Sequence, residues 1–210
     1  DGKVYRIKPR TNMGINKWWI SDEIRYGWKH VHSEDRLSSP LRRQFGVQVE
    51  SDWNRAYDDA AEGIAKAVAG GGKLGVLICP MLSCEDAYQL AMCALQMDAR
   101  AVLALGPVPM TGSDKSFPGG YTIHAEKCPN RRGVQRVIDA VVAANPRSTG
   151  AKFDEFTRAL HGGQINAAII TGNYPTDWST DALLRAMTGK FCVVADTLAG
   201  PLTRAADVVL

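Results

Sequence analysis

The chain has 210 residues, of which 45% are apolar and 22% are charged, and its formal net charge is +3. A chain of this length buries roughly 70% of its unfolded surface on folding, which is enough for one large domain or two small ones. The five cysteines are scattered and odd in number, which argues against a disulfide framework and suits the reduced thiols of a cytoplasmic protein. No run of about 18 apolar residues and no charged-then-apolar leader occurs, so we expect neither a membrane span nor a signal peptide.

The first part of the chain, residues 1–48, is predicted to be an irregular arm. It opens with an expected strand over residues 3–8, then Pro9 and an aromatic segment. Residues 1–43 carry ten Lys or Arg against five Asp or Glu, whereas the rest of the chain carries fifteen against seventeen. Because no nucleic-acid recognition motif accompanies this excess, we interpret it as a docking face or a solvated surface. Trp18, Trp19 and Trp28 are expected to pack over one edge of the body, since exposed aromatics at that density would form a patch.

The body is predicted to begin with a helix, a strand, a helix and a second strand. Apolar residues at three- and four-residue spacing predict a helix over residues 52–69, with Ser51 as a possible cap. The apolar run over residues 74–79 is typical of a buried parallel strand. Ser83 and Asp86 resemble a capping box that opens a helix to about residue 97, and residues 101–105 form the next strand.

A long loop is predicted over residues 106–133, which hold four prolines and five glycines. Loops of this length are usually functional or form interfaces. Helices and strands then alternate to the end of the chain, which predicts an α/β fold, a three-layer sandwich with a mostly parallel sheet. The expected helices cover residues 134–144, 152–160 and 181–187, and the expected strands cover 167–171, 191–195 and 207–210.

A ligand site is expected where the strands of this sheet end. In open parallel sheets, ligands bind beyond the carboxyl ends of the strands. Gly172 and Asn173 follow one predicted strand, and Asp196 and Thr197 follow the next, so these residues should share one edge. A glycine lets a ligand approach the backbone, and amide and carboxylate groups can bind a heterocycle, so the set suits a nucleotide. The alternative is that Gly172 and Asn173 form a turn and that Asp196 caps the following helix.

Other motifs in the chain indicate no separate chemistry. Glycines 70–72 precede a strand instead of following one, which is the wrong order for a phosphate loop and typical of a helix end. Cys79 and Cys84 have no second closely spaced pair to complete a metal site, so we interpret the cysteines as core residues. His30 and His32 lack further identifiable ligands. No glycine-x-serine-x-glycine elbow is present, so no hydrolase is indicated.

Several segments resemble one known family. They read N-K-W-W-I-S-D-E-I-R-Y-G-W-K-H-V-H-S-E-D-R-L-S-S-P-L over residues 16–41, P-N-R-R-G over 129–133, T-G-N-Y-P over 171–175 and V-V-A-D-T-L-A-G-P-L-T-R-A-A-D-V-V-L over 193–210. They are similar to segments of the G subunit of bacterial NADH-quinone oxidoreductase (respiratory complex I) and, more widely, of the molybdopterin oxidoreductases. The resemblance implies a formate dehydrogenase/DMSO reductase-like α/β domain over residues 49–210, behind an arm that follows an iron–sulfur segment.

The resemblance also bears on cofactors. Ser21 stands where the family usually has a cysteine, the last thiolate of a 4Fe-4S cluster, and a cluster is therefore expected only if serine does not disable it. In catalytic relatives the loops matching Gly172, Asn173, Asp196 and Thr197 hold molybdopterin guanine dinucleotide, with the aspartate near the guanine. Complex I G subunits generally hold no molybdenum cofactor, and the P-N-R-R-G segment is typical of them. We therefore expect a vestigial site and no cofactor in this chain.

The function that the resemblance implies is a structural and interaction scaffold for electron transfer from NADH to quinone, not catalytic by itself. Its expected partners are other subunits of a respiratory or hydrogenase-type complex, and its expected location is cytoplasmic, peripheral to the inner membrane through those subunits. The chain opens at Asp1 and closes on a strand pattern, so we expect a fragment of a longer subunit, truncated at the C-terminus, which could form a homo-oligomer when isolated. The alternative is a fragment of a catalytic molybdopterin-dependent oxidoreductase; a weaker one is a free-standing nucleotide-binding protein.

Overall fold

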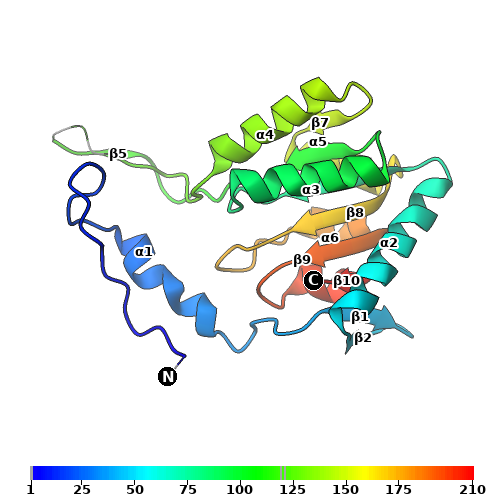
Figure 1. Ribbon diagram of the computed structural model, residues 1–210, viewed down its shortest axis with the longest axis horizontal. Coiled ribbons are helices and arrows are strands. Elements are labelled where there is room, and N and C mark those ends of the chain that lie inside the picture. Colours follow the sequence, from blue (N-terminus) through cyan, green and yellow to red (C-terminus); the bar gives the residue numbers. More distant parts are fainter. Residues whose placement is uncertain (1, 119, 121) are drawn as a thin grey trace.

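A computed structural model describes residues 2–118, 120 and 122–210, and at its centre lies an eight-stranded sheet (Figure 1). The strand order is β2-β1-β10-β9-β8-β3-β4-β7. The strands from β10 to β7 run parallel, whereas β1 pairs antiparallel with both β10 and β2. The predicted α/β fold with a mostly parallel sheet is therefore confirmed. The strands are β1 (Leu41–Gln44), β2 (Val47–Glu50), β3 (Lys73–Ile78), β4 (Val102–Leu105), β7 (Thr149–Ala151), β8 (Ile165–Thr171), β9 (Phe191–Ala195) and β10 (Val208–Val209).

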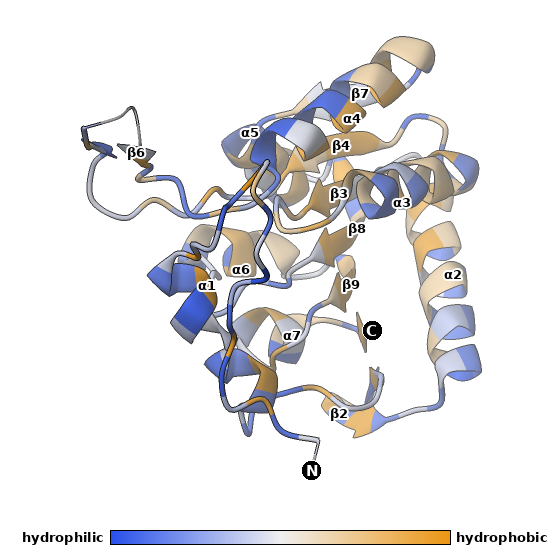
Figure 2. Cartoon of the chain, turned by 60° about the vertical axis from the view of Figure 1, so that its left-hand side comes forward, coloured by the Kyte–Doolittle hydropathy of each residue, from blue (hydrophilic) through white to orange (hydrophobic). Residues whose placement is uncertain are grey.

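Helices cover both faces of the sheet and complete the three layers. In β3, Val76 and Ile78 pack into one core with α2, α3 and α4, whereas Leu77 packs into the other core with α5, α6 and α7. This alternation follows from the two-residue period of a strand and explains why the strands are apolar on both faces. Figure 2 shows β3, β4, β8 and β9 mostly in hydrophobic colours between these helices. The helices are α2 (Trp53–Ala69), α3 (Cys84–Met97), α4 (Arg131–Ala144), α5 (Phe153–His161), α6 (Asp181–Met187) and α7 (Pro201–Ala205).

Of the two helix caps that the sequence predicts, the cap of α3 is confirmed and the cap of α2 is not. The Ser83 hydroxyl accepts a hydrogen bond from the Asp86 amide at 3.0 Å and begins α3, as predicted. The cap of α2 is Asp52, whose carboxylate accepts from the Arg55 amide at 2.9 Å, and the prediction of Ser51 was wrong by one position. Both residue types cap well, so periodicity alone does not choose between neighbours.

The N-terminal arm holds two short helices, and two expectations for it were wrong. Residues 3–8 form no strand, because no described strand lies beside them to take up their hydrogen bonds. Trp18 and Trp19 do not cover the body, since 64% and 54% of their surfaces are exposed. Trp28 is partly buried and contacts the His32 ring, with 6.2 Å between centroids. The two helices are α1 (Asp22–Tyr26) and the 3-10 helix η1 (Gly27–His32).

The end of the arm docks on the carboxyl edge of the sheet. The Leu37 amide donates to the Thr197 carbonyl at 3.0 Å, and the Ala199 amide donates to the Asp35 carbonyl at 2.7 Å. The sheet then begins at Leu41, inside the segment 1–48 that the sequence analysis assigns to the arm. These backbone bonds fix η1 next to the loop that follows β9.

The long loop after β4 contains a small hairpin of β5 (Lys115–Ser116) and β6 (Thr122–Ile123). The hairpin and the arm project from the same side of the molecule (Figure 1). An ion pair of 3.1 Å between Lys127 and Glu23 joins the base of the hairpin to α1. Beyond it, Asn130 donates to the Leu82 and Pro80 carbonyls, so the P-N-R-R-G segment fastens the start of α4 to the loop after β3.

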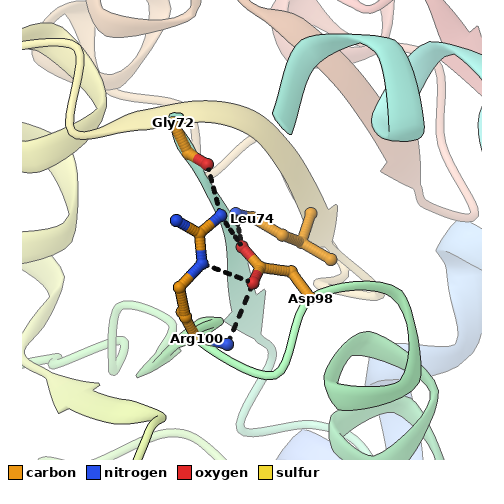
Figure 3. A network of polar contacts seen from close by, with 4 residues as sticks. All are labelled: Gly72, Leu74, Asp98 and Arg100. Carbon is orange, nitrogen blue, oxygen red and sulfur yellow. Dashed lines mark hydrogen bonds and ion pairs between the residues drawn. The ribbon is translucent and has the colours of Figure 1, made fainter. Parts of the chain in front are cut away.

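A charge network between the buried Asp98 and the exposed Arg100 holds the opposite, amino end of β3 (Figure 3). The Asp98 carboxylate accepts from the Leu74 amide at 3.1 Å and from the Arg100 side chain at 3.0 Å. Arg100 also donates to the Gly72 carbonyl at 3.0 Å. Burial by itself raises the pKa of Asp98, but the hydrogen bonds from Arg100 and Leu74 outweigh it and lower the pKa below its ordinary value.

Within the described part of the chain, no helix combines the length and the apolar character needed to cross a bilayer.

Candidate functional site

The carboxyl ends of β8 and β9 bring the four predicted site residues together. Gly172 and Asn173 follow β8, and Asp196 and Thr197 follow β9, with the two strands paired side by side. The Asp196 Oδ1 atom accepts from the Asn173 amide at 2.9 Å and from the Thr197 amide at 2.7 Å. The expected common edge is therefore present, and one carboxylate ties its two loops together.

Gly172 and Asn173 owe their residue types to this close approach. The Gly172 amide donates to the Ala195 carbonyl at 2.7 Å, and a side chain at position 172 would collide with the Asp196 carboxylate. Asn173 adopts a left-handed backbone with φ of 73°, which asparagine tolerates better than most residues. No turn is assigned at Gly172 and Asn173, so their interpretation as a turn stays a prediction. Asp196, however, does not cap α7, whose N-cap is Gly200.

A tryptophan is the third donor to the carboxylate. The Trp178 indole N–H donates to Asp196 Oδ2 at 3.1 Å. A carboxylate offers about four lone-pair positions. Two backbone amides and an indole of the protein itself already use most of them, so Asp196 keeps only a part of its acceptor capacity for a ligand.

Tyr174 fills the crevice at the switch point of the sheet. From β3 the chain proceeds outward to β4 and β7 and then returns to β8 on the other side of β3, so the loops diverge between β3 and β8. Tyr174 follows β8 after Gly172 and Asn173 and is only 2% exposed. Its hydroxyl donates to the Pro107 carbonyl beyond β4 at 2.6 Å, so the side chain crosses this crevice. Its ring packs on Trp178 with 4.8 Å between centroids, and burial raises the pKa of the phenol above its usual range.

The floor of this crevice is also closed by hydrogen bonds. The Thr171 hydroxyl donates to the Leu77 carbonyl at 3.0 Å and accepts from the Cys79 amide at 2.8 Å. Burial raises the pKa of the Cys79 thiol to about 12, so this cysteine stays protonated near neutral pH. Cys79 is a core residue, as the sequence analysis expects, whereas Cys93 is exposed.

An open cavity of about 470 Å³ lies on the other side of Trp178. The loops after β8 and β9 form one wall with Trp178 and Asp196, and the arm forms the other with Lys29 and His30. The volume is within the range of small-molecule sites. Beside Asp196, the buried Thr197 hydroxyl has no hydrogen-bond partner among the described atoms.

Ser21 serves as the N-cap of α1. Its hydroxyl accepts from the Ile24 amide at 3.4 Å, a long hydrogen bond. The carboxyl group of the neighbouring Glu23 has a lowered pKa. The larger cause is the hydrogen bond from its own backbone amide, and the second is the hydrogen bond from Lys127. Among the described residues, no three His, Cys, Asp or Glu side chains converge in a way that could hold a metal ion.

The sequence analysis did not identify Trp178, Lys29 and His30 as parts of this site, and it included Tyr174 only within the T-G-N-Y-P segment. The position of Trp178 offered a signal, because an indole in the polar segment T-D-W-S-T, shortly after a strand, usually finds a hydrogen-bond partner. Lys29 and His30 reach the cavity through the docking of the arm, which no local pattern encodes.

Comparison with known proteins gives partial matches, and no family model matches the chain. Over 88 residues it is 36% identical to the G subunit of the NADH-quinone oxidoreductase of Streptomyces coelicolor, covering 41% of this chain and 10% of that protein. Over 96 residues it is 29% identical to a putative formate dehydrogenase of Bacillus subtilis, covering 45% of this chain and 10% of the relative. The alpha subunit of the F420-dependent formate dehydrogenase of Methanocaldococcus jannaschii is 34% identical over 64 residues, or 30% of this chain and 10% of that protein.

The matched region thus spans about a tenth of the length of these relatives. G subunits from other bacteria match as well, with 32% identity over 94 residues in Mycobacterium bovis. The chain is therefore similar to a segment of the NADH-quinone oxidoreductase G subunits and the formate dehydrogenase alpha subunits, which confirms the resemblance to the molybdopterin oxidoreductase-like superfamily.

Proposed function

We propose that this chain acts as a structural and interaction segment of an NADH-quinone oxidoreductase G-type subunit. In this role it supports neighbouring subunits that carry electrons from NADH to quinone, and it holds no redox centre itself. It would be cytoplasmic and peripheral to the inner membrane through those partners. The observation that carries the proposal is the use of the Asp196 carboxylate by the protein's own Asn173, Thr197 and Trp178 donors.

The crevice at the switch point supports the same conclusion. A dinucleotide on an open parallel sheet lies across the strand ends where the loops diverge. Between β3 and β8 this space holds the buried Tyr174 side chain, tied to the Pro107 carbonyl. The residues present there do not fit a guanine dinucleotide that crosses the crevice, and we derive no chemistry through such a group.

Ser21 supports the absence of an iron–sulfur ligand at that position. Cluster irons are normally held by thiolates, and a serine hydroxyl has none to offer. Here the hydroxyl accepts a hydrogen bond from the Ile24 amide. Its local role is the cap of α1, which needs no metal.

The test is an elemental and spectroscopic analysis of the purified chain. We expect less than about a tenth of an equivalent of iron, molybdenum or tungsten per chain, together with an absorbance spectrum that ends below the visible region. Iron with visible absorption would overturn the scaffold role, because the chain would then carry a centre of its own. Molybdenum or tungsten with a fluorescent pterin would transfer the assignment to the second candidate.

That second candidate is a fragment of a catalytic molybdopterin-dependent oxidoreductase. Two observations favour it: the similarity to the formate dehydrogenases and the 470 Å³ cavity beside Asp196. Gly172, Asn173, Asp196 and Thr197 would then hold the guanine end of the cofactor beside this cavity, to whose wall Asp196 contributes. Bound there, a molybdopterin group would supply oxidation–reduction chemistry.

A titration with guanosine diphosphate separates the two candidates. Because the Trp178 indole lines the cavity, a bound guanine would change its fluorescence, and the Trp178→Phe variant isolates that signal. The scaffold proposal expects no saturable change up to about 1 mM nucleotide, a concentration that reveals any site with a free energy of binding near −4 kcal/mol or better. Saturable binding that is lost in Asp196→Asn but kept in an Asp58→Asn control, at an exposed position of α2 away from the cavity, would favour the second candidate.

A further inference from the structure

The hairpin of β1 and β2 ends in an unusual, outward-facing residue. Its two-residue turn consists of Phe45 and Gly46, with φ of 49° and 84°. Turns with two positive φ values are normally built from Asn-Gly or Asp-Gly, because a bulky side chain is strained in the left-handed region. This turn nevertheless has a phenylalanine at its first position, and the Phe45 side chain is fully exposed. The neighbouring Val47 is 61% exposed as well.

The turn is held firmly in place. The Arg43 guanidinium donates to the Gly46 carbonyl at 3.1 Å and, on the body, to the Arg204 carbonyl at 2.5 Å and the Ala206 carbonyl at 2.9 Å. Gln48 also donates to the Thr203 and Ala206 carbonyls. An exposed ring on a fixed support loses little conformational freedom when it is buried in a contact.

The strand beside this ring is an edge of the sheet. β2 is the terminal strand in the order, and it pairs only with β1 among the described strands. In a hairpin with a two-residue turn, the residues that flank the turn exchange hydrogen bonds, and so does every second pair beyond them. Gln44 opposes Val47 and Arg42 opposes Val49, so the backbone groups of Gln48 and Glu50 point to the open edge. β2 carries no lysine or proline of the kind that usually protects such an edge.

This edge is complementary to itself. If two copies of β2 pair antiparallel about a two-fold axis at Val49, Gln48 of each copy opposes Glu50 of the other, and Val49 opposes Val49. About four backbone hydrogen bonds form between the outward-facing groups. Glu50 opposes the neutral Gln48, whose side-chain amide stays bound to the Thr203 and Ala206 carbonyls of its own copy, so no like charges meet. Two β-branched residues form the central contact.

The same register brings the exposed aromatic residues at the two ends of β2 together. Phe45 precedes the strand, and Trp53 follows it at the start of α2. Trp53 and Tyr57 are 49% and 53% exposed, and their rings lie 5.6 Å apart. Antiparallel pairing places the turn of one copy at the α2 end of the other, so Phe45 meets this pair on both sides of the axis.

We propose that the open edge of β2 is a homodimer interface, in which a second copy of this chain extends the sheet and Phe45 packs against the Trp53–Tyr57 pair of that copy. A two-fold contact of this kind uses one surface patch on both copies and closes on itself, so the assembly stops at two. The proposal is independent of the proposed function, since it requires neither a cofactor nor a particular subunit partner.

The test is sedimentation velocity of the 210-residue chain over a range of concentrations. Phe45→Asn is the decisive variant, because Asn-Gly suits the turn and leaves the folded monomer intact while the anchor ring is lost. Val47→Lys tests the edge independently by adding a charge at an exposed position of β2. We expect a concentration-dependent dimer whose Kd rises about tenfold or more in either variant. Phe117→Asn, on the distant β5–β6 hairpin, is the matched control and should leave the Kd unchanged.

Three results would overturn the proposal. The first is a chain that stays monomeric at all concentrations, because the edge of β2 would then pair with no second copy and would be open to a strand of another protein. The second is a dimer that persists in both Phe45→Asn and Val47→Lys, because its interface must then lie elsewhere. The third is a ladder of larger species, since a two-fold contact cannot propagate. Thermal unfolding of each variant, compared at a concentration where the chain is monomeric, verifies that the variants fold.

Discussion

The sheet body and the N-terminal arm bury their apolar side chains to very different extents. In the body, Phe156 and Leu77 are completely buried between the layers. In the arm, Trp18 is 64% exposed and Ile15 is 85% exposed. The body therefore holds its own shape through its core, whereas the arm is held mainly by the few backbone bonds to the loop after β9.

The difference teaches where each region gains its stability. Layers of parallel strands and helices satisfy their backbone groups and bury their side chains internally. The arm leaves apolar surface outside, and residues 2–20 contain five Lys or Arg and no Asp or Glu. A basic surface with exposed aromatic residues is typical of a region that completes its packing against another molecule. This agrees with the proposed interaction role.

Truncation of one large apolar side chain in each region gives the largest expected contrast. Phe156→Ala leaves a cavity under α5 and should lower the free energy of unfolding by about 3–5 kcal/mol. Trp18→Ala removes an exposed ring and should change it by less than about 0.5 kcal/mol. Chemical denaturation of both variants measures the difference. A Trp18→Ala cost comparable to that of Phe156→Ala would show that the arm is part of the core after all.

The second contrast is between two aspartates. Asp98→Ala leaves the buried Leu74 amide without a partner and should lower the free energy of unfolding by about 2–3 kcal/mol at pH 7. Asp58→Ala is the control on the exposed face of α2, and its unfolding midpoint should stay unchanged.

The Asp98 effect should also depend on pH with a definite sign. The folded pKa of this carboxyl group is lowered, so its stabilisation is complete above the unfolded value of about 3.9 and is lost as the pH falls through the folded pKa. The penalty of Asp98→Ala, measured by denaturation at pH 7 and at pH 3, should therefore shrink at the lower pH. A penalty that grows on acidification would contradict the role of the charge.

A smaller effect is expected at the switch point. Tyr174→Phe keeps the ring in the crevice but leaves the Pro107 carbonyl without its donor, and should cost about 1 kcal/mol. Denaturant titration measures the cost, with Tyr88→Phe on the exposed side of α3 as the control. If Tyr174→Phe is as neutral as Tyr88→Phe, the hydroxyl does not fasten the loops across the crevice.

The smallest effect is expected in the arm. Ser21→Ala removes the cap of a five-residue helix whose hydrogen bond is long, and should cost about 0.5 kcal/mol or less. Amide hydrogen exchange should speed up in α1 while β3 and β8 stay unchanged. Faster exchange throughout the sheet would mean that the two regions unfold together.

The body was the more predictable region from the sequence, for a physical reason. Its helices repeat apolar residues at helical spacing, and the strand after α6 was placed correctly over Phe191–Ala195 because an apolar run between Gly189 and polar residues is a strong signal. The β1–β2 hairpin was missed although Val47 and Val49 alternate with polar residues. Its Phe45-Gly46 turn lacks the usual asparagine or aspartate, and arginines occupy the middle of β1.

The site was predictable in position but not in content. Strand ends placed Asn173 and Asp196 at one edge, since parallel strands share a direction. No pattern in the sequence indicated that Trp178 would donate to the same carboxylate or that Tyr174 would fill the crevice. These contacts depend on how a loop folds back over the sheet, and the exposure of Trp18 likewise depends on where the arm lies.

The Arg43 guanidinium connects parts of the chain that are about 160 positions apart, because its hydrogen bonds join the turn at Gly46 to the carbonyls that end α7. Any opening of the C-terminal helix must release the hairpin, and any fraying of the hairpin exposes those carbonyls to water. The β1–β2 hairpin and α7 should therefore form a single cooperative unit. Their backbone amides should become protected from hydrogen exchange together, although the two segments lie far apart in the sequence.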